Sequence, residues 1–227
     1  MFKKLFGGKR AGDDETGVAD EAFAAAKQAA MERALGPMDE MVLHSLIPFF
    51  LGGGLDLYTF RKCMPGTVVA TQELIGRGRS ERPKKSRIGA YELVACLRPG
   101  VAIETESGDG TAMVTGGERD GIGLVRAMLN PISQYAFMAK LNPGETAEIP
   151  MDEGEPNLPV LFDEFRSVDW GLAPFEIGDE RFGLLLCVPL HWSELAFARR
   201  EGTGKLKERL EGAGVWPYAD LGRVAVV

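Results

Sequence analysis

Alternating apolar and polar positions predict a β-sheet in the first half of the chain. In residues 55–60, LDLYTF, every second side chain is leucine or threonine, and Asp56 opens the other set. Successive side chains of a strand point to opposite faces, so this pattern indicates a strand with two different faces. Residues 181–192 are almost wholly apolar, which indicates a strand in the middle of the sheet. The predicted strands are residues 55–60, 67–75, 90–98, 160–170, 181–192 and 222–227.

Helical periodicity appears between these strands. Residues 18–36 predict an alanine-rich helix, because acidic residues open the segment, a basic residue lies near its end and a Gly-Pro pair stops it. Residues 38–50 suit either a helix or a strand. Apolar residues at helical spacing on both sides of Pro131 predict two helices or one bent helix, with Asn130 as an N-cap. Two short helices, residues 193–202 and 204–214, each close with glycine.

The order of these elements predicts the fold class. Strands, helices, strands and helices follow one another, which is typical of an α/β or mixed α+β domain with a mixed, largely antiparallel sheet flanked by helices. The proline- and acid-rich residues 141–159 indicate a loop. We expect residues 1–17 to form a disordered tail, residues 18–36 an N-terminal helix, and residues 37–227 one domain.

The charge of the chain excludes some classes of partner. A net charge of -7 argues against non-specific nucleic-acid binding, which needs a basic surface. The basic start MFKKLFGGKR either touches a membrane weakly or is a solubilising tail; no apolar run is long enough for stable membrane insertion. A second basic run either touches an acidic partner or is a solvated loop. It comprises Arg77, Arg79, Arg82, Lys84, Lys85 and Arg87.

Cysteine use indicates a reducing compartment. Cys63, Cys96 and Cys187 lie far apart in apolar, strand-like surroundings, and no CxxC pair occurs. Small buried thiols, not a disulfide framework, are therefore expected. This predicts a cytoplasmic protein.

Candidate catalytic chemistry is sparse, and we expect no catalytic residue, no metal and no cofactor. His44 and His191 lie in different segments; they either join Asp56 or Glu194 in a metal site or are partly buried histidines bonded to backbone carbonyls. The carboxylates that interrupt apolar sequence, Asp56, Glu73, Glu92 and Glu194, either converge and shift one another's pKa, as in a hydrolase, or face water separately. Glu194 follows Ser193 in the first turn of a predicted helix, where the helix dipole favours an anion.

Several ordered motifs resemble the suppressor-of-fused domain family. They are GLDLYTF, TVVATQELI and YELVACLR, then LLLCVPLHWSELAFARREGTGKLKERLEGAGV and the terminal LGRVAVV. The family pattern places an aspartate on an early strand, an EL pair on a later strand, and a strand that runs through proline into an acidic helix. The matching positions are Asp56, Glu92, Leu93, Pro189, Glu194, Gly202, Leu206, Leu210 and Arg223. The resemblance covers residues 36–227 and rests on the order and spacing of these motifs.

The resemblance implies a non-catalytic, intracellular protein-binding domain. Animal members hold transcription factors in a cleft beside a sheet, partly by strand addition, and bacterial single-domain members look like immunity proteins that neutralise toxins. We expect another protein as partner, bound by an acidic rim of Asp56, Glu92 and Glu194 and by Trp192. The tryptophans Trp170, Trp192 and Trp216 either anchor the partner or pack in the core or its rim, and Trp192 is the one expected to be partly exposed. The alternative is a hydrolase-like enzyme that uses clustered carboxylates.

Overall fold

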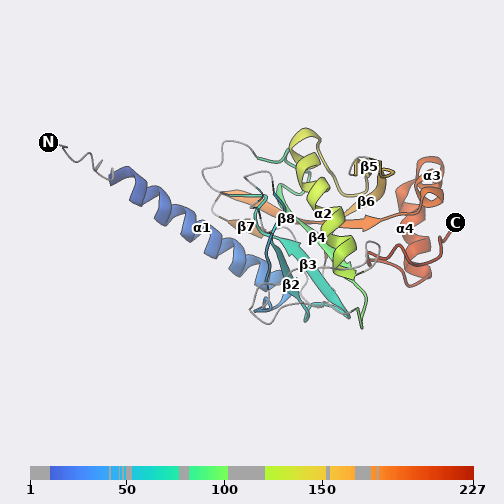
Figure 1. Ribbon diagram of the computed structural model, residues 1–227, viewed down its shortest axis with the longest axis horizontal. Coiled ribbons are helices and arrows are strands. Elements are labelled where there is room, and N and C mark those ends of the chain that lie inside the picture. The colour runs from blue at the N-terminus through green and yellow to red at the C-terminus, as the bar shows by residue number, and fades with distance from the viewer. Residues whose placement is uncertain are drawn as a thin grey trace.

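The chain folds around one mixed sheet (Figure 1). The computed structural model describes residues 11–40, 42–45, 47, 49, 53–76, 82–101, 121–151, 154–166, 175–177 and 179–227, with the backbone alone at 11–20 and 175. Its helices are α1 (Ala11–Leu35), α2 (Gly121–Met138), α3 (Trp192–Glu201) and α4 (Thr203–Gly212). Its strands are β1 (Val42–Leu43), β2 (Leu57–Phe60), β3 (Thr67–Thr71), β4 (Ala90–Leu97), β5 (Thr146–Ile149), β6 (Leu158–Glu164), β7 (Phe175–Ile177) and β8 (Glu180–Pro189).

The sheet has the order β1-β2-β3-β4-β8-β6-β5, and β7 pairs with β8 beside β6. Neighbouring strands are antiparallel except β4 and β8, which run parallel. The predicted mixed, largely antiparallel sheet is therefore confirmed. The apolar β8 lies inside the sheet, as its sequence predicts, since a strand covered on both faces has no need of polar alternation.

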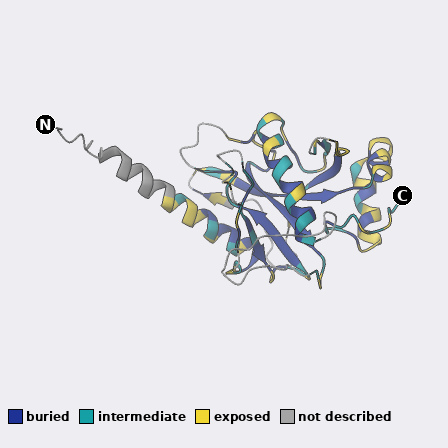
Figure 2. Ribbon diagram, viewed as in Figure 1, coloured by how far each residue is buried: buried dark blue, intermediate teal, exposed yellow. Residues whose placement is uncertain are grey.

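Helices cover both faces of the sheet, and the strands between them are almost entirely buried (Figure 2). On one face, α2 packs Val125, Met128 and Leu129 against β4 and its neighbours. On the other face, the last turns of α1 bury Met31 and Leu35 against the opposite side chains of β2, β3, β4 and β8. A third cluster joins α3 and α4 to Leu161 of β6 and to Leu190, the residue that follows β8.

α2 is one helix with Pro131 inside it. The N-cap prediction for Asn130 is wrong, because this residue lies within the helix and its Oδ1 accepts a hydrogen bond from the Leu55 N–H at 2.9 Å. That bond links the helix to the segment before β2. The sequence could not reveal it, since 75 residues separate the two partners.

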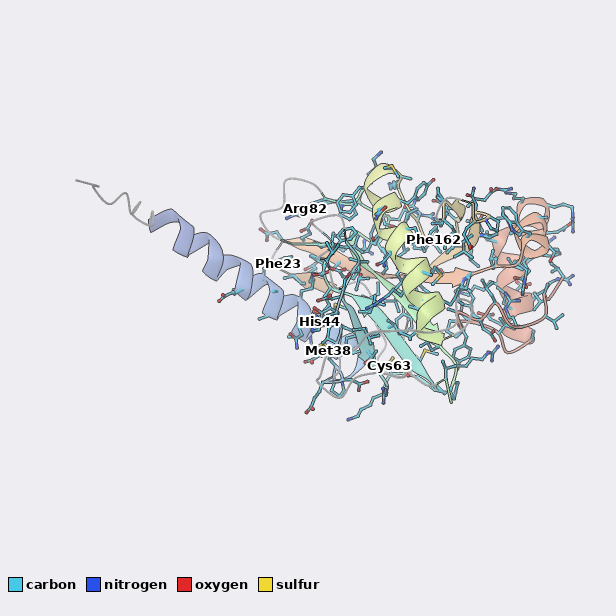
Figure 3. All side chains as sticks on the ribbon, in the orientation of Figure 1. Phe23, Met38, His44, Cys63, Arg82 and Phe162 are labelled. Carbon is cyan, nitrogen blue, oxygen red and sulfur yellow. The ribbon has the colours of Figure 1, made fainter. Side chains whose placement is uncertain are left out.

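α1 begins at Ala11, ahead of the expected start at residue 18, so residues 11–17 are helical. The first turns of α1 lie away from the sheet (Figure 1), whereas Phe23, labelled in Figure 3, lies on the part of α1 nearer the sheet. The Phe23 ring centroid is 5.8 Å from that of Phe182, near the start of β8. The basic residues 1–10 fall outside the described ranges. The division of the chain into a tail, a helix and one domain stays a prediction.

Three further expectations are corrected. Residues 222–227 do not form a strand, because Arg223 turns inward and pairs with the buried Glu194 of α3. β3 stops at Thr71, where the following turn wraps around Glu92. Conversely, β5 forms inside the segment expected to be a loop, 141–159. No helix in the described part of the chain is long and apolar enough to cross a membrane.

Candidate functional site

Asp56 connects the edge strand to the sheet. Its Oδ1 accepts a hydrogen bond from the Ser45 N–H at 2.8 Å, and its Oδ2 lies 2.7 Å from Nδ1 of His44. The His44 side chain is exposed and pairs with this carboxylate, so the expected backbone-carbonyl partner is wrong for His44. Asp56 itself is partly exposed, and it fixes the chain that follows the short strand β1.

Glu92 is buried inside the fold at 2% exposure. Its Oε1 lies 2.7 Å from Nζ of Lys27, which α1 supplies at 3% exposure. Its Oε2 accepts a hydrogen bond from the Thr71 hydroxyl at 2.7 Å, and the N–H groups of Leu74 and Ile75 donate to the two oxygens at 3.2 and 3.1 Å. Every part of this carboxylate is satisfied internally, so it anchors α1 to the turn after β3.

Glu194 is buried at the start of α3. Its oxygens accept two hydrogen bonds from Arg223 at 2.5 and 2.7 Å, one from the Val226 N–H and one from the His191 N–H, which completes a capping box. Burial opposes ionisation, yet these bonds outweigh it and hold the pKa of Glu194 below its ordinary value. The prediction that Glu194 lies in the first turn of a helix is confirmed.

The expected acidic rim is therefore not formed. Glu92 and Glu194 are both internal and separately paired, whereas Asp56 is partly exposed and pairs with His44. Among the residues that the structure describes, no three His, Cys, Asp or Glu side chains are placed to hold a metal. Trp192 is partly exposed, as expected, at 49%.

His191 has the expected carbonyl partner, because its Nε2 lies 2.9 Å from the Arg223 oxygen. The three cysteines are buried and form no disulfide, as predicted. Burial raises the pKa of Cys63 to about 11 and the pKa values of Cys96 and Cys187 above their ordinary value. These thiols therefore stay protonated at neutral pH and are poor nucleophiles.

A groove of about 940 Å³ lies where β6 ends, and we name it the β6 groove. Six chain segments far apart in sequence build it: the turn after β2, the turn before β4, the turn before β5, the end of β6, the start of β8, and α4 with the segment that follows. It is lined by Met64, Pro65, Arg87, Ile88, Pro143, Gly144, Asp163, Glu164, Phe165, Arg166, Arg181, Lys207, Trp216, Pro217 and Tyr218.

Aromatic side chains form part of the β6 groove. Phe165 is buried, whereas Trp216 and Tyr218 are partly exposed. Nζ of Lys207 lies 4.6 Å from the centre of the Trp216 ring, and the Tyr218 hydroxyl donates a hydrogen bond to the Pro65 oxygen at 3.0 Å. These contacts hold the rings in place, and fixed aromatic side chains are effective anchors for a bound polypeptide.

Cations outnumber carboxylates along the β6 groove. Four basic and two acidic residues line it, so its formal charge is +2 although the chain carries -7. Lys207 pairs with Asp163 at 2.5 Å, and Arg166 pairs with Glu164 at 2.6 Å. Within the described residues, Arg87 and Arg181 have no carboxylate partner, although Arg87 donates to the Pro143 oxygen.

The last residue of β6 presents an open backbone edge to this groove. Phe165 donates its N–H to Leu184 of β8, and alternate residues of a strand bond to opposite sides. On the outer side, the backbone of Phe162 accepts a hydrogen bond from the Gly144 N–H and donates one to the Glu145 oxygen. Within the described residues, no backbone hydrogen bond continues this pairing beyond Phe162. The N–H of Glu164 donates to the Asp163 side chain at 2.8 Å, and no described strand pairs with Glu164 on this side.

Sequence reasoning singled out little of the β6 groove. Arg87 belongs to the basic run, and Trp216 is one of three tryptophans considered as anchors; Trp170 lies outside the described residues. Arg181 and Lys207 carried no local signal, because their proximity arises from packing between distant segments. Of the other members of the basic run, Arg77 and Arg79 lie outside the described residues, and Arg82 and Lys85 pair with Glu180.

Comparisons with known proteins report on the fold. No protein-family model and no curated protein matches this chain. Among solved structures, a chain of "the Sufu-Fu complex crystal structure" superposes with a TM-score of 0.57 at 15% sequence identity, covering 91% of this chain and 91% of that chain. At this identity the likeness concerns the backbone, and it extends over nearly the whole domain. The chain therefore has a Sufu-like fold.

Proposed function

We propose that this chain is an intracellular protein-binding domain and that the β6 groove holds a segment of its partner. The observation that carries the proposal is the open edge of Glu164 beside fixed aromatic rings and unpaired cations. Its fold is similar to that of a chain in the Sufu-Fu complex crystal structure. Three buried cysteines with no disulfide among them support a reducing compartment.

Binding by strand addition suits this geometry. A partner segment that lies along the end of β6 gains a main-chain hydrogen bond from the Glu164 C=O and displaces the Asp163 side chain from the Glu164 N–H. Its side chains meet Trp216 and Tyr218. Tyrosine, tryptophan and arginine are the residues that most often carry binding energy at interfaces. No bond needs to be made or broken for this role.

The residues expected to bind a partner divide into two groups. Asp56 and Trp192 have exposed surface and remain candidates for additional contacts outside the β6 groove. Glu92 and Glu194 are satisfied inside the fold, and a direct contact would require the loss of their buried ion pairs. We therefore assign these two carboxylates to stability.

The test is affinity capture from the native cell, with the full chain as bait and mass spectrometry as readout. The groove variant is Arg87→Glu/Arg181→Glu. The control is Arg33→Glu/Lys140→Glu, which changes the charge equally at exposed residues outside the groove. A protein captured by the unchanged chain and the control, and lost from the groove variant, supports the proposal. Equal capture by all three baits contradicts it, provided that thermal unfolding shows each variant to be folded.

A narrower role as an immunity protein also rests on the sequence resemblance. It predicts that co-expression of this chain rescues cells from a toxin encoded beside its gene. Rescue that survives in the control and disappears in the groove variant supports this role. Failure to rescue would leave the protein-binding proposal standing and remove the immunity role.

A further inference from the structure

We propose that the β6 groove selects an acidic, extended polypeptide segment. This inference rests on the proposed function, and it adds the chemistry of the partner. Such a segment places backbone against Glu164, carboxylates against Arg87 and Arg181, and an apolar side chain against Trp216. In an extended segment alternate side chains share a face, so acidic residues two positions apart present both charges on one side.

The charge argument begins with the cations that the fold leaves unpaired. Lys207 and Arg166 are already neutralised by Asp163 and Glu164. Within the described residues, no carboxylate pairs with Arg87 or Arg181, although the chain as a whole carries a net charge of -7. An anionic segment removes this imbalance, whereas a basic segment adds to it.

The two arginines are held near each other by a tight turn. Residues 86–89 fold back on themselves through paired hydrogen bonds between Ser86 and Gly89. At Gly89, with φ of +95°, a Cβ atom would lie 2.2 Å from the Arg181 oxygen. The turn that carries Arg87 therefore packs directly against the backbone of Arg181, and the two cations lie on adjoining segments of the groove wall.

Polypeptide fits this site better than nucleic acid, which is also anionic. The groove carries only two surplus charges and includes two carboxylates, Asp163 and Glu164, that repel a run of phosphates. Its strand edge offers the C=O of Glu164 to an added strand, and the N–H of Glu164 can join once it exchanges the Asp163 side chain for the added backbone. We therefore commit to an acidic peptide.

The test uses a display library of random dodecamer peptides, panned on the unchanged full chain. Each recovered peptide is synthesised with a fluorescent label. Its binding is then measured by anisotropy against the unchanged chain, Arg87→Glu/Arg181→Glu, and Arg33→Glu/Lys140→Glu. A single-stranded DNA oligonucleotide serves as competitor, and a Trp216→Phe variant keeps an aromatic ring in the groove as a second check.

The inference predicts that groove-dependent peptides are enriched in Asp and Glu. They lose about tenfold or more in affinity with the Arg87→Glu/Arg181→Glu variant, keep their affinity for the control, and weaken as salt is added. Groove-dependent peptides that are neutral or basic would overturn the inference and leave the proposed function intact. Recovery of no groove-dependent peptide would count against both. Displacement by the oligonucleotide at the same affinity would replace the acidic peptide with nucleic acid.

Discussion

Buried carboxylates at Glu92 and Glu194 show how much one residue depends on partners that are distant in sequence. Each is paired with one cation, Lys27 or Arg223, and each accepts backbone N–H bonds as well. A buried pair of this kind contributes little when intact relative to an apolar replacement, but it is costly to break on one side.

Replacing Glu194 with glutamine tests this cost. Glu194→Gln leaves Arg223 buried without a countercharge, and we expect the free energy of unfolding to fall by roughly 3 kcal/mol. Urea unfolding measures the loss. Glu201→Gln is the matched control, because Glu201 makes only exposed ion pairs near the end of the same helix, and it should have little effect. Equal losses in the two variants would remove the special role of the buried pair.

The same residue predicts a pH dependence. The pKa of Glu194 is lowered in the folded state from an ordinary value of 4.5. Its stabilising contribution is therefore complete above that unfolded value and is lost as pH falls through the lower folded pKa. The difference in unfolding free energy between the unchanged chain and Glu194→Gln should stay constant near neutral pH and shrink as the pH falls below 4.5. A difference that grows on acidification would contradict this sign.

At Tyr91, in contrast to Glu194, we expect the loss of a buried polar group not to destabilise the fold. Its side chain is fully buried, and within the described residues its hydroxyl has no hydrogen-bond partner. Because an unsatisfied buried hydroxyl costs about 1 kcal/mol or more, Tyr91→Phe should leave stability unchanged or raise it by about this amount. Thermal and urea unfolding provide the measurement. A clear destabilisation would mean that the hydroxyl has a partner.

At the scale of elements, sequence pattern located the strands with clear alternation, such as β2, or with a long apolar run, but missed β5 and left the region of β1 undecided. β4 and β8 were predicted because their side chains are apolar on both faces. β5, with four residues, and β1, with two, carry too little pattern to stand out from the loops around them. The Arg223 segment was mistaken for a strand because its β-branched residues are a local signal, whereas its partner Glu194 is not.

Lys27 is the residue that ties α1 to the sheet. It donates hydrogen bonds to the oxygens of Gln72 and Ile75 and pairs with Glu92. Lys27→Met leaves the buried Glu92 carboxylate without a countercharge. We therefore expect a loss of roughly 3 kcal/mol in the free energy of unfolding and faster amide hydrogen exchange in α1. Lys85→Met, which breaks an exposed pair, is the control. Unchanged exchange in α1 would show that apolar packing alone holds the helix.

The turn before β4 depends on glycine. At Gly89 the backbone has φ of +95°, and a Cβ atom would meet the Arg181 oxygen at 2.2 Å. Gly214 also has positive φ, +65°, yet nothing lies within 4 Å of its Cβ position. Gly214→Ala should cost about 1 kcal/mol from backbone strain, and Gly89→Ala clearly more, because strain and overlap add. Equal unfolding midpoints for the two variants would contradict the close approach.

At the scale of the whole molecule, the fold class was predicted from the sequence and the candidate site was not. Order and spacing of motifs indicated a suppressor-of-fused type of domain, and the backbone superposes on a Sufu structure with a TM-score of 0.57. The β6 groove combines six segments that are distant in sequence, and nothing in the local sequence around Arg181 and Lys207 distinguishes them from other basic residues. The carboxylates chosen from the sequence stood out because they interrupt apolar runs. At Glu92 and Glu194 the reason for this pattern is that the carboxylate itself is buried.

The most direct measurement is site-specific photocrosslinking in the native cell. A photoreactive benzoylphenylalanine replaces Arg166, an exposed residue of the β6 groove, or Val224, an exposed residue outside it. If the groove holds a partner polypeptide, irradiation gives a discrete crosslinked product from position 166 and none from position 224. The absence of a product at 166, or the same product from both positions, would contradict the account.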